Sequence, residues 1–339
     1  MTGVPKRRYA VLAEGRLRDP NAKTAHGLIR YGEDEIAAVI DSTLAGQRVL
    51  EAMPELRRDA PIVATVEEAL AYGPTSILVG LAPPGGRLPE DWLQTLRTAA
   101  DAGVEIVSGL HQRLAPLFPG AKVWDVREPP DDVPLFSGEG LAVESKVALT
   151  VGTSSAIGKM TATLEIQRAA SKAGVSARFV PTGQTGVVIA GWGICVDAVV
   201  SDFVAGAAEQ LVLRAAKTSP DLVLVEGQGA LGHPAYSGVT VGLLHGSCPD
   251  CLVLCADASE ERIMGLVPRP SPARIARLYE QTAALVKQAP VVAVSVNTKG
   301  LEDDVAQEFL ARVADETGLP TTDPLRHTAT PILKAILEA

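Results

Sequence analysis

The chain has 339 residues, enough for two domains with separate hydrophobic cores. Hydrophobic residues make up 47% of it and aromatic residues only 4%, a composition typical of α/β proteins with close-packed helices and parallel strands. The net charge of −9 argues against an extended basic surface for nucleic acid, and no stretch approaches the roughly 20 apolar residues of a membrane span. We therefore expect a cytoplasmic protein that binds neither nucleic acid nor membrane.

Short apolar runs alternate with helical patterns through the first part of the chain. Strands are expected at residues 8–15, 35–41, 75–80 and 104–109, helices at 65–71 and 89–103, and a polar loop at 17–34. This alternation predicts a doubly wound parallel sheet, as in Rossmann-like domains. Gly15 and Asp41 end strands where the crevice of such a sheet forms, and they serve either a ligand or the turns alone. A dinucleotide is not predicted, because no G-x-G-x-x-G follows the first strand.

A second domain follows a connection without periodicity. Residues 126–145 are rich in Pro, Asp and Glu and join a Rossmann-like domain at 1–125 to a P-loop NTPase-like domain at 146–339. In the second domain we expect strands at 147–151, 177–181, 221–226, 251–255 and 291–296, and helices at 198–217, 239–245, 274–288, 303–317 and 331–337. The fold class is therefore α/β, with both domains three-layered and built on mainly parallel sheets.

The strongest functional signal is a glycine-bounded loop between an apolar run, Val147–Val151, and a helical pattern. The loop reads GTSSAIGKMT, and its Gly158 and Lys159 open the helix. Strand, loop, lysine and helix in this order form a phosphate-binding loop, in which backbone N–H groups, a helix N-terminus and a lysine face an anion. The residues expected to bind phosphate are Gly152, Thr153, Ser154, Ser155, Gly158, Lys159, Met160 and Thr161.

This loop departs from the usual pattern G-x-x-x-x-G-K-[ST] in two places. Gly152 comes one residue early, and Met160 stands at the hydroxyl position, with Thr161 next. A glycine-rich turn that binds nothing is the alternative interpretation. We favour phosphate binding because Gly158 and Lys159 stand in the required strand–helix context, and we expect Lys159 to face ligand or solvent.

Polar residues at other strand ends extend the candidate site. Glu226 ends the strand at 221–226, the usual place for an acid that holds Mg²⁺ beside a phosphate loop; a structural cap is the alternative. Gln184 lies in a second glycine-bounded loop, TGQTG at 182–186, and belongs to the predicted cofactor-binding set. Asn297 follows the last clear strand, where nucleotide bases or substrates are often contacted.

Two further side chains are candidates for catalysis, together with Lys159 and Glu226. His233 lies in GHPAYSG, a polar loop that suits ligand binding. Asp202 lies near the start of the predicted helix 198–217, on the face that also carries Glu209, where a solvated acidic stripe is the alternative.

The chain has four cysteines, and Cys248, Cys251 and Cys255 form the pattern C-x-x-C-x-x-x-C, whereas Cys195 stands apart from it. Such spacing invites a metal or redox interpretation. Cys251 and Cys255, however, flank CLVLC, which reads as a buried strand, and free cysteine is a common core residue. We therefore predict buried thiols and no metal ligands among them.

Several segments taken together resemble one family: VGTSSAIGKMT, FVPTGQTGVVIAG, VDAVVSDFVAGAAE, LVEGQG and HPAYSGVTVGLLHG. Over essentially its whole length the chain resembles a family with Rossmann-like N-terminal and P-loop C-terminal domains that includes the D-glutamate N-acetyltransferases. The second domain is also similar to dethiobiotin synthetase, whose loop has the same early glycine and whose VEG matches Val225–Gly227. The family loop usually reads Gly-Thr-Asp-Cys where this chain has Ser154 and Ser155.

The family resemblance implies transfer of an acetyl group from acetyl-CoA, as co-substrate, to the amine of an amino acid, most of all D-glutamate. The phosphate loop would hold the phosphates of acetyl-CoA, and no metal is needed. The ammonium proton would pass to a base, and backbone N–H groups of residues 183–186 or 227–229 would stabilise the oxyanion. The candidate bases are Glu226, His233 and Asp202, and the candidate carboxylate-binding residues are Arg30 and Arg326.

The likeness to dethiobiotin synthetase supports a second hypothesis, an ATP- and Mg²⁺-dependent ligase or kinase. Lys159 would hold the β- and γ-phosphates, Thr161 and Glu226 would hold Mg²⁺, and Asn297 would meet the base. A nucleotide-sensing module without turnover is a third class, disfavoured by the many polar strand-end loops. A symmetric homo-oligomer is also expected for an apolar, glycine-rich chain of this kind.

Overall fold

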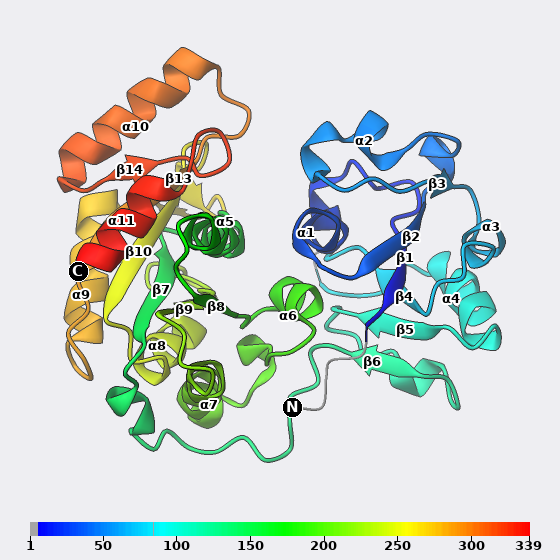
Figure 1. Cartoon of the computed structure of the whole chain (residues 1–339), viewed down its shortest axis with the longest axis horizontal. Helices are drawn as coiled ribbons and strands as arrows, with labels where there is room; N and C mark the ends of the chain where they lie inside the picture. Colours follow the sequence, from blue (N-terminus) through cyan, green and yellow to red (C-terminus); the bar gives the residue numbers. More distant parts are fainter. Residues whose placement is uncertain (1–5, 84) are drawn as a thin grey trace. The chain divides into compact units, whose positions relative to one another are not determined.

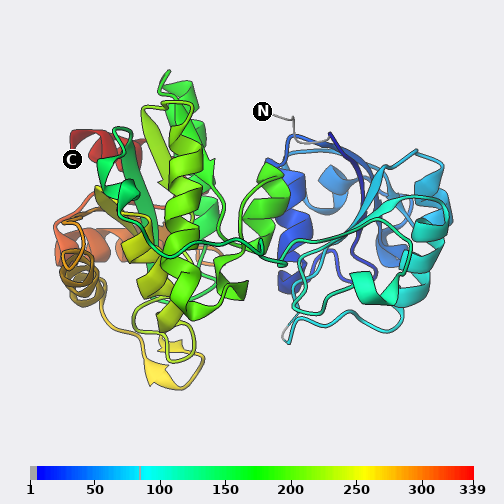
Figure 2. The ribbon, with the colours of Figure 1, turned by 90° about the horizontal axis from the view of Figure 1, so that it is seen from below.

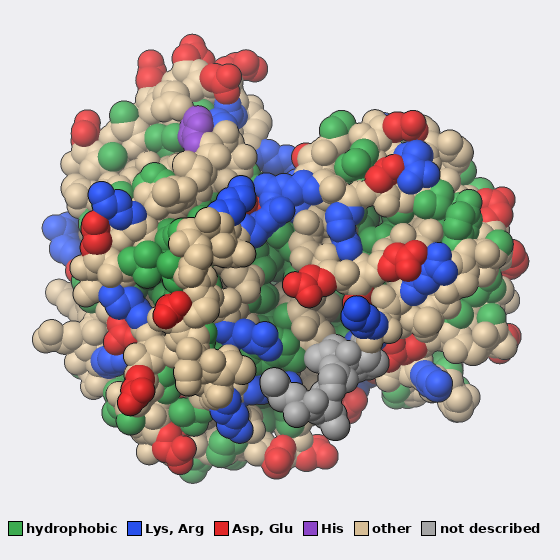
Figure 3. Space-filling model, viewed as in Figure 1, with side chains coloured by type: hydrophobic (Ala, Val, Ile, Leu, Met, Phe, Trp, Pro, Cys, Tyr) green, Lys and Arg blue, Asp and Glu red, His purple; other side chains and the backbone are tan. Residues whose placement is uncertain are grey.

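The computed structural model describes residues 6–83 and 85–339, and these form two compact units (Figure 1). The first unit runs to Pro129 and also takes in Gln184–Cys195, a segment from the middle of the chain. The second unit consists of Pro130–Gly183 and Val196–Ala339. On the face seen in Figure 3, each unit carries both acidic and basic side chains on its surface. No helix in the described residues is long and apolar enough to cross a membrane.

A six-stranded parallel sheet forms the centre of the first unit, in the order β3-β2-β1-β4-β5-β6. The strands are β1 (Arg8–Leu12), β2 (Glu35–Ile40), β3 (Ile62–Val63), β4 (Ser76–Val79), β5 (Glu105–Ser108) and β6 (Val123–Asp125). The helices are α1 (Lys23–Tyr31), α2 (Val49–Ala52), α3 (Val66–Leu70), α4 (Trp92–Asp101) and α6 (Gln184–Ala190). α1 packs against α6, and α3 packs against α4 (Figure 2). The doubly wound sheet expected from the alternating pattern is confirmed.

The second unit also contains a six-stranded parallel sheet, in the order β14-β13-β10-β7-β9-β8. Its strands are β7 (Lys146–Gly152), β8 (Ala177–Val180), β9 (Leu222–Val225), β10 (Cys251–Asp257), β13 (Val291–Asn297) and β14 (Thr321–Thr322), and a separate hairpin pairs β11 (Arg262–Ile263) with β12 (Val267–Pro268). Because β7 lies in the interior of this sheet, the loop that follows it starts among the carboxyl ends of β9 and β10.

Helices cover the second sheet on both faces. They are α5 (Lys159–Lys172), α7 (Val204–Ala216), α8 (Ser237–Gly246), α9 (Pro272–Ala283), α10 (Asp303–Thr317) and α11 (Thr330–Glu338). α5 packs against α11, and Ile166 and Ala170 of α5 meet Ile332 and Ile336 of α11 in one core cluster with Leu224 of β9. This apolar contact fixes the direction of α5, and with it the position of the loop at its N-terminus.

Two segments predicted as loops are helical. The polar stretch 17–34 contains α1, whose Ala25, Leu28 and Ile29 are buried. In the predicted loop 182–186, Thr182 and Gly183 lie outside any helix, but α6 begins at Gln184. The polar composition of 17–34 and the glycines of 182–186 indicated loops, but buried side chains on one face of each helix override these local signals: Leu28 and Ile29 in α1, and Val187 and Val188 in α6.

The long helix predicted at 198–217 is broken. Its first residues form short 3-10 turns, η6 (Val196–Ala198) and η7 (Ser201–Phe203), before α7 begins at Val204. Glu209 of α7 does not belong to a solvated acidic stripe, since only 2% of it is exposed. Its carboxylate accepts hydrogen bonds from the N–H groups of Ser137 (2.7 Å) and Gly140 (3.0 Å). Glu209 therefore anchors the segment that leads into β7.

Candidate phosphate-binding site

The phosphate loop is held at its first residue by a buried tyrosine. Tyr279 of α9 is fully buried, and its hydroxyl donates to the carbonyl oxygen of Gly152 at 2.9 Å. The same hydroxyl accepts hydrogen bonds from the N–H groups of Gly152 (3.3 Å) and Leu231 (3.0 Å). One side chain thus joins the loop after β7 to the loop after β9. The sequence gives no signal for this role, because Tyr279 lies more than a hundred residues from the loop.

The loop presents a row of free backbone donors. Among the described residues, no hydrogen-bond acceptor contacts the N–H groups of residues 154–161, and Gly158 caps α5 without a side-chain hydrogen bond. Ala156 (φ 57°) and Gly158 (φ 103°) adopt positive φ angles within this run. Consecutive N–H groups in such a turn, at the N-terminus of a 14-residue helix, form a binding site for an anion.

Lys159 contributes a buried positive charge to this loop. It was expected to face ligand or solvent, but only 6% of it is exposed, and its Nζ donates to the carbonyl oxygen of Ser154 at 2.7 Å. Burial lowers the pKa of Lys159 to about 8, and the negative charges of Glu226 and Glu260 oppose this change. A lysine with this pKa is still mostly protonated at neutral pH, so it can neutralise a bound phosphate.

Glu226 lies at the carboxyl end of β9, beside β7. Its Oε2 accepts hydrogen bonds from the N–H groups of Thr182 (3.0 Å) and Gly183 (3.2 Å), and it is buried. Burial raises the pKa of Glu226 to about 7, although these N–H groups and Lys159 favour the charged form. A carboxyl group with this pKa is suited to exchange protons near neutral pH.

The backbone groups predicted to stabilise an oxyanion are partly engaged. The N–H of Gly183 donates to Glu226, and the N–H of Gly227 donates to Thr150 Oγ1 at 2.9 Å. Gly183 and Gly227 therefore serve the framework of the site.

His233 contacts the phosphate loop directly. Its Nε2 lies 3.1 Å from Ser155 Oγ, and its Nδ1 accepts a hydrogen bond from the N–H of Ala235 at 3.2 Å. Its ring stacks on Tyr236, with 4.4 Å between the ring centroids. Burial lowers the pKa of His233, so the neutral ring is favoured. Because Nδ1 accepts, the proton of the neutral ring lies on Nε2, which donates to Ser155.

The other predicted residues are not all gathered at the loop. Asp202 is exposed in η7 and interacts with Ser201 Oγ at 3.5 Å. Gln184 belongs to the first unit, where its Oε1 accepts a hydrogen bond from Arg127 at 2.8 Å. Asn297 donates from Nδ2 to Asp257 Oδ2 at 2.7 Å and accepts from the N–H of Lys299 at 3.1 Å, which engages both ends of its amide.

The loop also contacts an acid that the sequence did not single out. Ser154 Oγ donates to Glu260 Oε1 at 2.7 Å, although Glu260 lies beyond β10. Thr161, one of the conditional metal ligands, is partly exposed. The described residues contain no group of three or more His, Cys, Asp or Glu that could hold a metal ion, and all four cysteines are buried and free.

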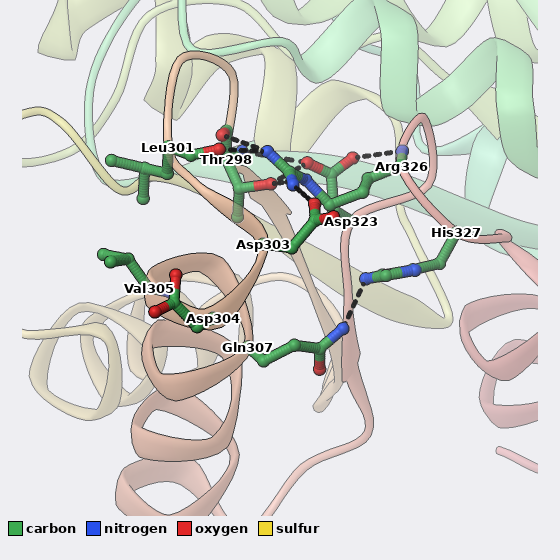
Figure 4. A network of polar contacts seen from close by, with 9 residues as sticks. All are labelled: Thr298, Leu301, Asp303, Asp304, Val305, Gln307, Asp323, Arg326 and His327. Atoms are coloured by element: carbon green, nitrogen blue, oxygen red, sulfur yellow. Dashed lines mark hydrogen bonds and ion pairs between the residues drawn. The ribbon is translucent and has the colours of Figure 1, made fainter.

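The two arginines considered for substrate carboxylates have structural partners. Arg326 donates to Thr298 Oγ1 (3.1 Å) and to the carbonyl oxygen of Leu301 (2.6 Å), and it forms an ion pair with Asp303 (Figure 4). Arg30 Nε donates to the carbonyl oxygen of Glu55 at 3.0 Å. Arg326 thereby joins the loop after β13 to the turn after β14.

Replacing Gly227 by alanine should strongly destabilise the second unit. A Cβ atom at this position would lie 1.8 Å from the carbonyl oxygen of Thr150 and 3.0 Å from Cδ of Lys159, so β7 and the end of β9 would have to separate. We expect a loss of about 3 kcal/mol or more in the free energy of unfolding, measured by urea denaturation. The matched control is Gly238→Ala in α8, where no atom lies within 4 Å. It should leave stability unchanged or raise it by up to about 1 kcal/mol. Equal stability of the two variants would contradict this packing argument.

Comparison with known proteins agrees with this architecture. A family model described as a domain of unknown function, DUF1611_C P-loop domain, matches residues 134–333, and the DUF1611_N Rossmann-like domain matches residues 42–129. The chain belongs to the DUF1611 family. A solved DUF1611 family protein from Anabaena variabilis is 40% identical, with a TM-score of 0.91, and the match covers 98% of this chain and all of that one.

Two curated relatives of this DUF1611 protein carry the name D-glutamate N-acetyltransferase. The relative from Pseudoalteromonas sp is 34% identical over 310 residues, which cover 86% of this chain and 92% of that protein. The relative from Tritonibacter scottomollicae is 35% identical over 284 residues, or 80% of this chain and 84% of that protein. The resemblance inferred from the sequence is therefore confirmed.

Proposed function

We propose that this protein is an N-acetyltransferase that moves the acetyl group of acetyl-CoA to the amine of an amino acid, with D-glutamate as the preferred acceptor. The names of the two curated relatives support the reaction and the acceptor. The structural observation that carries the proposal is the loop at residues 154–161, whose N–H groups have no acceptor among the described residues and which ends on the buried Lys159. An acyl donor with phosphate groups is the ligand that this loop fits.

The residues of the loop support a CoA thioester as the donor. Backbone N–H groups and Lys159 would bind its phosphates without a hydroxyl ligand to a metal ion. Met160 occupies the position at which phosphate loops of nucleotide-hydrolysing proteins carry a metal-binding Ser or Thr. This substitution favours acetyl-CoA over ATP with Mg²⁺ as the co-substrate.

The chemistry requires a base, because only the neutral amine is nucleophilic. In our proposal Glu226 takes a proton from the substrate ammonium, and the nitrogen then forms a bond to the carbonyl carbon of the thioester. As the C–S bond breaks, the nitrogen loses its second proton, and this proton passes to the departing thiolate of CoA. The hydroxyl of Ser155 accepts a hydrogen bond from His233, so its own hydrogen is available to the oxyanion of the tetrahedral intermediate.

Donor binding should weaken as the pH rises through the pKa of Lys159, about 8. This pKa lies below the ordinary value of lysine because of burial, so the positive charge is lost at higher pH, whereas the phosphates of CoA stay ionised. We expect the affinity for CoA, measured by isothermal titration calorimetry, to fall about tenfold or more between pH 7 and 10. The variant Lys159→Arg, which keeps its charge over this range, should show a smaller fall. If the affinity for CoA fell equally in both proteins, loss of the charge of Lys159 would not be the cause of the fall.

The proposal is tested by following thiol release from acetyl-CoA in the presence of D-glutamate, L-glutamate or D-aspartate, with and without a metal chelator. We expect the fastest release with D-glutamate and no effect of the chelator. Release that depends on Mg²⁺ and ATP, or none with any amino acid, would overturn the proposal.

A further inference from the structure

Glu260 has a carboxylate oxygen with no partner in the described residues. Its Oε1 accepts a hydrogen bond from Ser154 Oγ at 2.7 Å, whereas its Oε2 is buried and has no hydrogen-bond partner there. A buried carboxylate oxygen left without a donor costs free energy. The residue as a whole is partly exposed, but Oε2 itself is covered, so a ligand reaches this oxygen after a movement of the side chains around it.

The surroundings of Glu260 identify it as part of the phosphate-loop site. Ser154, its partner, is a loop residue whose own carbonyl oxygen accepts from Lys159 Nζ. The charge of Glu260 acts on both Lys159 and His233, and it favours the protonated form of each. The short hairpin β11–β12, shown in yellow in Figure 2, follows Glu260 immediately and returns the chain to α9.

An acid beside an anion-binding loop calls for a positively charged group. Because a carboxylate repels the phosphates of the donor, the free oxygen of Glu260 should bind a positively charged group instead. Mg²⁺ beside a phosphate loop is held by one or two carboxylates together with the phosphates of a nucleotide, whereas the donor proposed here binds without a metal ion. A single free carboxylate oxygen, already fixed by Ser154, fits an ammonium group, which brings three donors.

We propose that Glu260 binds the ammonium group of the amino-acid acceptor through Oε2 and so selects an amine at the phosphate loop. This inference rests on the proposed acetyl transfer and adds to it the residue that recognises the acceptor amine. Glu226 takes the proton, and Glu260 keeps a hydrogen bond to the nitrogen while the amide bond forms. The charge of Glu260 thereby favours an amine over hydroxy acids that share the carboxylates of the acceptor but lack its ammonium.

The test compares D-glutamate with D-2-hydroxyglutarate, which has a hydroxyl in place of the ammonium, by isothermal titration calorimetry. Glu260→Gln keeps an oxygen that can accept from Ser154 but removes the charge. We expect this variant to bind D-glutamate about tenfold or more weakly, because the ammonium loses a charge-assisted hydrogen bond. It should bind the hydroxy acid within about twofold of the unmodified protein, because a neutral hydroxyl loses much less. The control is Glu261→Gln, at the exposed neighbouring residue, which should change neither affinity.

Two further measurements, the CoA affinity of the Glu260→Gln variant and acetyl transfer by the unmodified protein, distinguish a failure of the role of Glu260 from a failure of the proposed function. CoA affinity within about twofold of the unmodified protein would show that the loop of the Glu260→Gln variant is intact. Equal weakening of D-glutamate and the hydroxy acid, or no change in either, would overturn the role of Glu260 while leaving acetyl transfer standing. If the unmodified protein transfers no acetyl group to any amino acid, the proposed function fails, and the role of Glu260 fails with it.

Discussion

Replacing Lys159 by methionine is expected to lower kcat/KM for acetyl transfer by about 10²–10³-fold or more, because the site loses its only buried positive charge beside the free loop N–H groups in the described residues. Methionine keeps most of the volume, so the buried position does not become a cavity. The variant also removes the cost of burying an ammonium group, which partly offsets the lost hydrogen bond to Ser154. We therefore expect the thermal midpoint to stay within about 5 °C of the unmodified protein.

The matched control for this variant is Lys172→Met, at the exposed end of the same helix, α5. It should retain full activity. Steady-state kinetics with acetyl-CoA and D-glutamate, together with a thermal melt of each variant, make the comparison. Full activity of a folded Lys159→Met protein would show that the phosphate loop takes no part in the reaction.

Replacing Glu226 by glutamine is expected to lower kcat by about 10²–10⁴-fold, since the proposed base is removed while the oxygen that accepts from Thr182 and Gly183 is kept. The pKa of Glu226 also determines the direction in which this substitution changes the stability of the protein. Burial raises the pKa of Glu226 to about 7, so above pH 7 the fold must tolerate a charge that it disfavours. At pH 8 the neutral glutamine should therefore leave the thermal midpoint unchanged or raise it.

Glu209→Gln provides the contrasting case in the same unit. Burial raises the pKa of Glu209, but hydrogen bonds from Gly140 and Ser137 outweigh this and lower it overall. The charged form is thus favoured by folding, and this stability is present above the unfolded-state pKa and is lost in acid. At pH 8, Glu209→Gln should lower the thermal midpoint and leave kcat nearly unchanged. Loss of kcat in both variants alike would indicate a general effect of neutralising a buried acid.

The strands and the phosphate loop could be predicted because their signals are local. The run Val147–Val151 is continuous in the sequence, and Gly158 and Lys159 follow at a fixed spacing. The local signal was wrong for residues 184–186, where flanking glycines indicated a loop but the chain forms the start of α6, which packs against α1. The return of this segment to the first unit depends on contacts distant in the sequence, which no spacing reveals.

The electrostatics of the site could be predicted only in part. The positions of Lys159 and Glu226 follow from strand ends, but their burial, which sets their pKa values, depends on surrounding structure. Glu260 follows no motif and reaches Ser154 only because β10 ends beside β7. Asp202 was linked to the site because it lies near the start of the predicted helix 198–217. The helix α7 begins only at Val204, and Asp202 lies exposed in the turn before it.

The most direct measurement of the central claim is mass spectrometry of D-glutamate after incubation with the purified protein and acetyl-CoA carrying a ¹³C-labelled acetyl group, in the presence of a chelator. We predict a product with the mass of D-glutamate plus one labelled acetyl group, formed in proportion to the free CoA released. CoA release without labelled product, or unaltered D-glutamate beside intact acetyl-CoA, would contradict the proposal that this protein is a D-glutamate N-acetyltransferase.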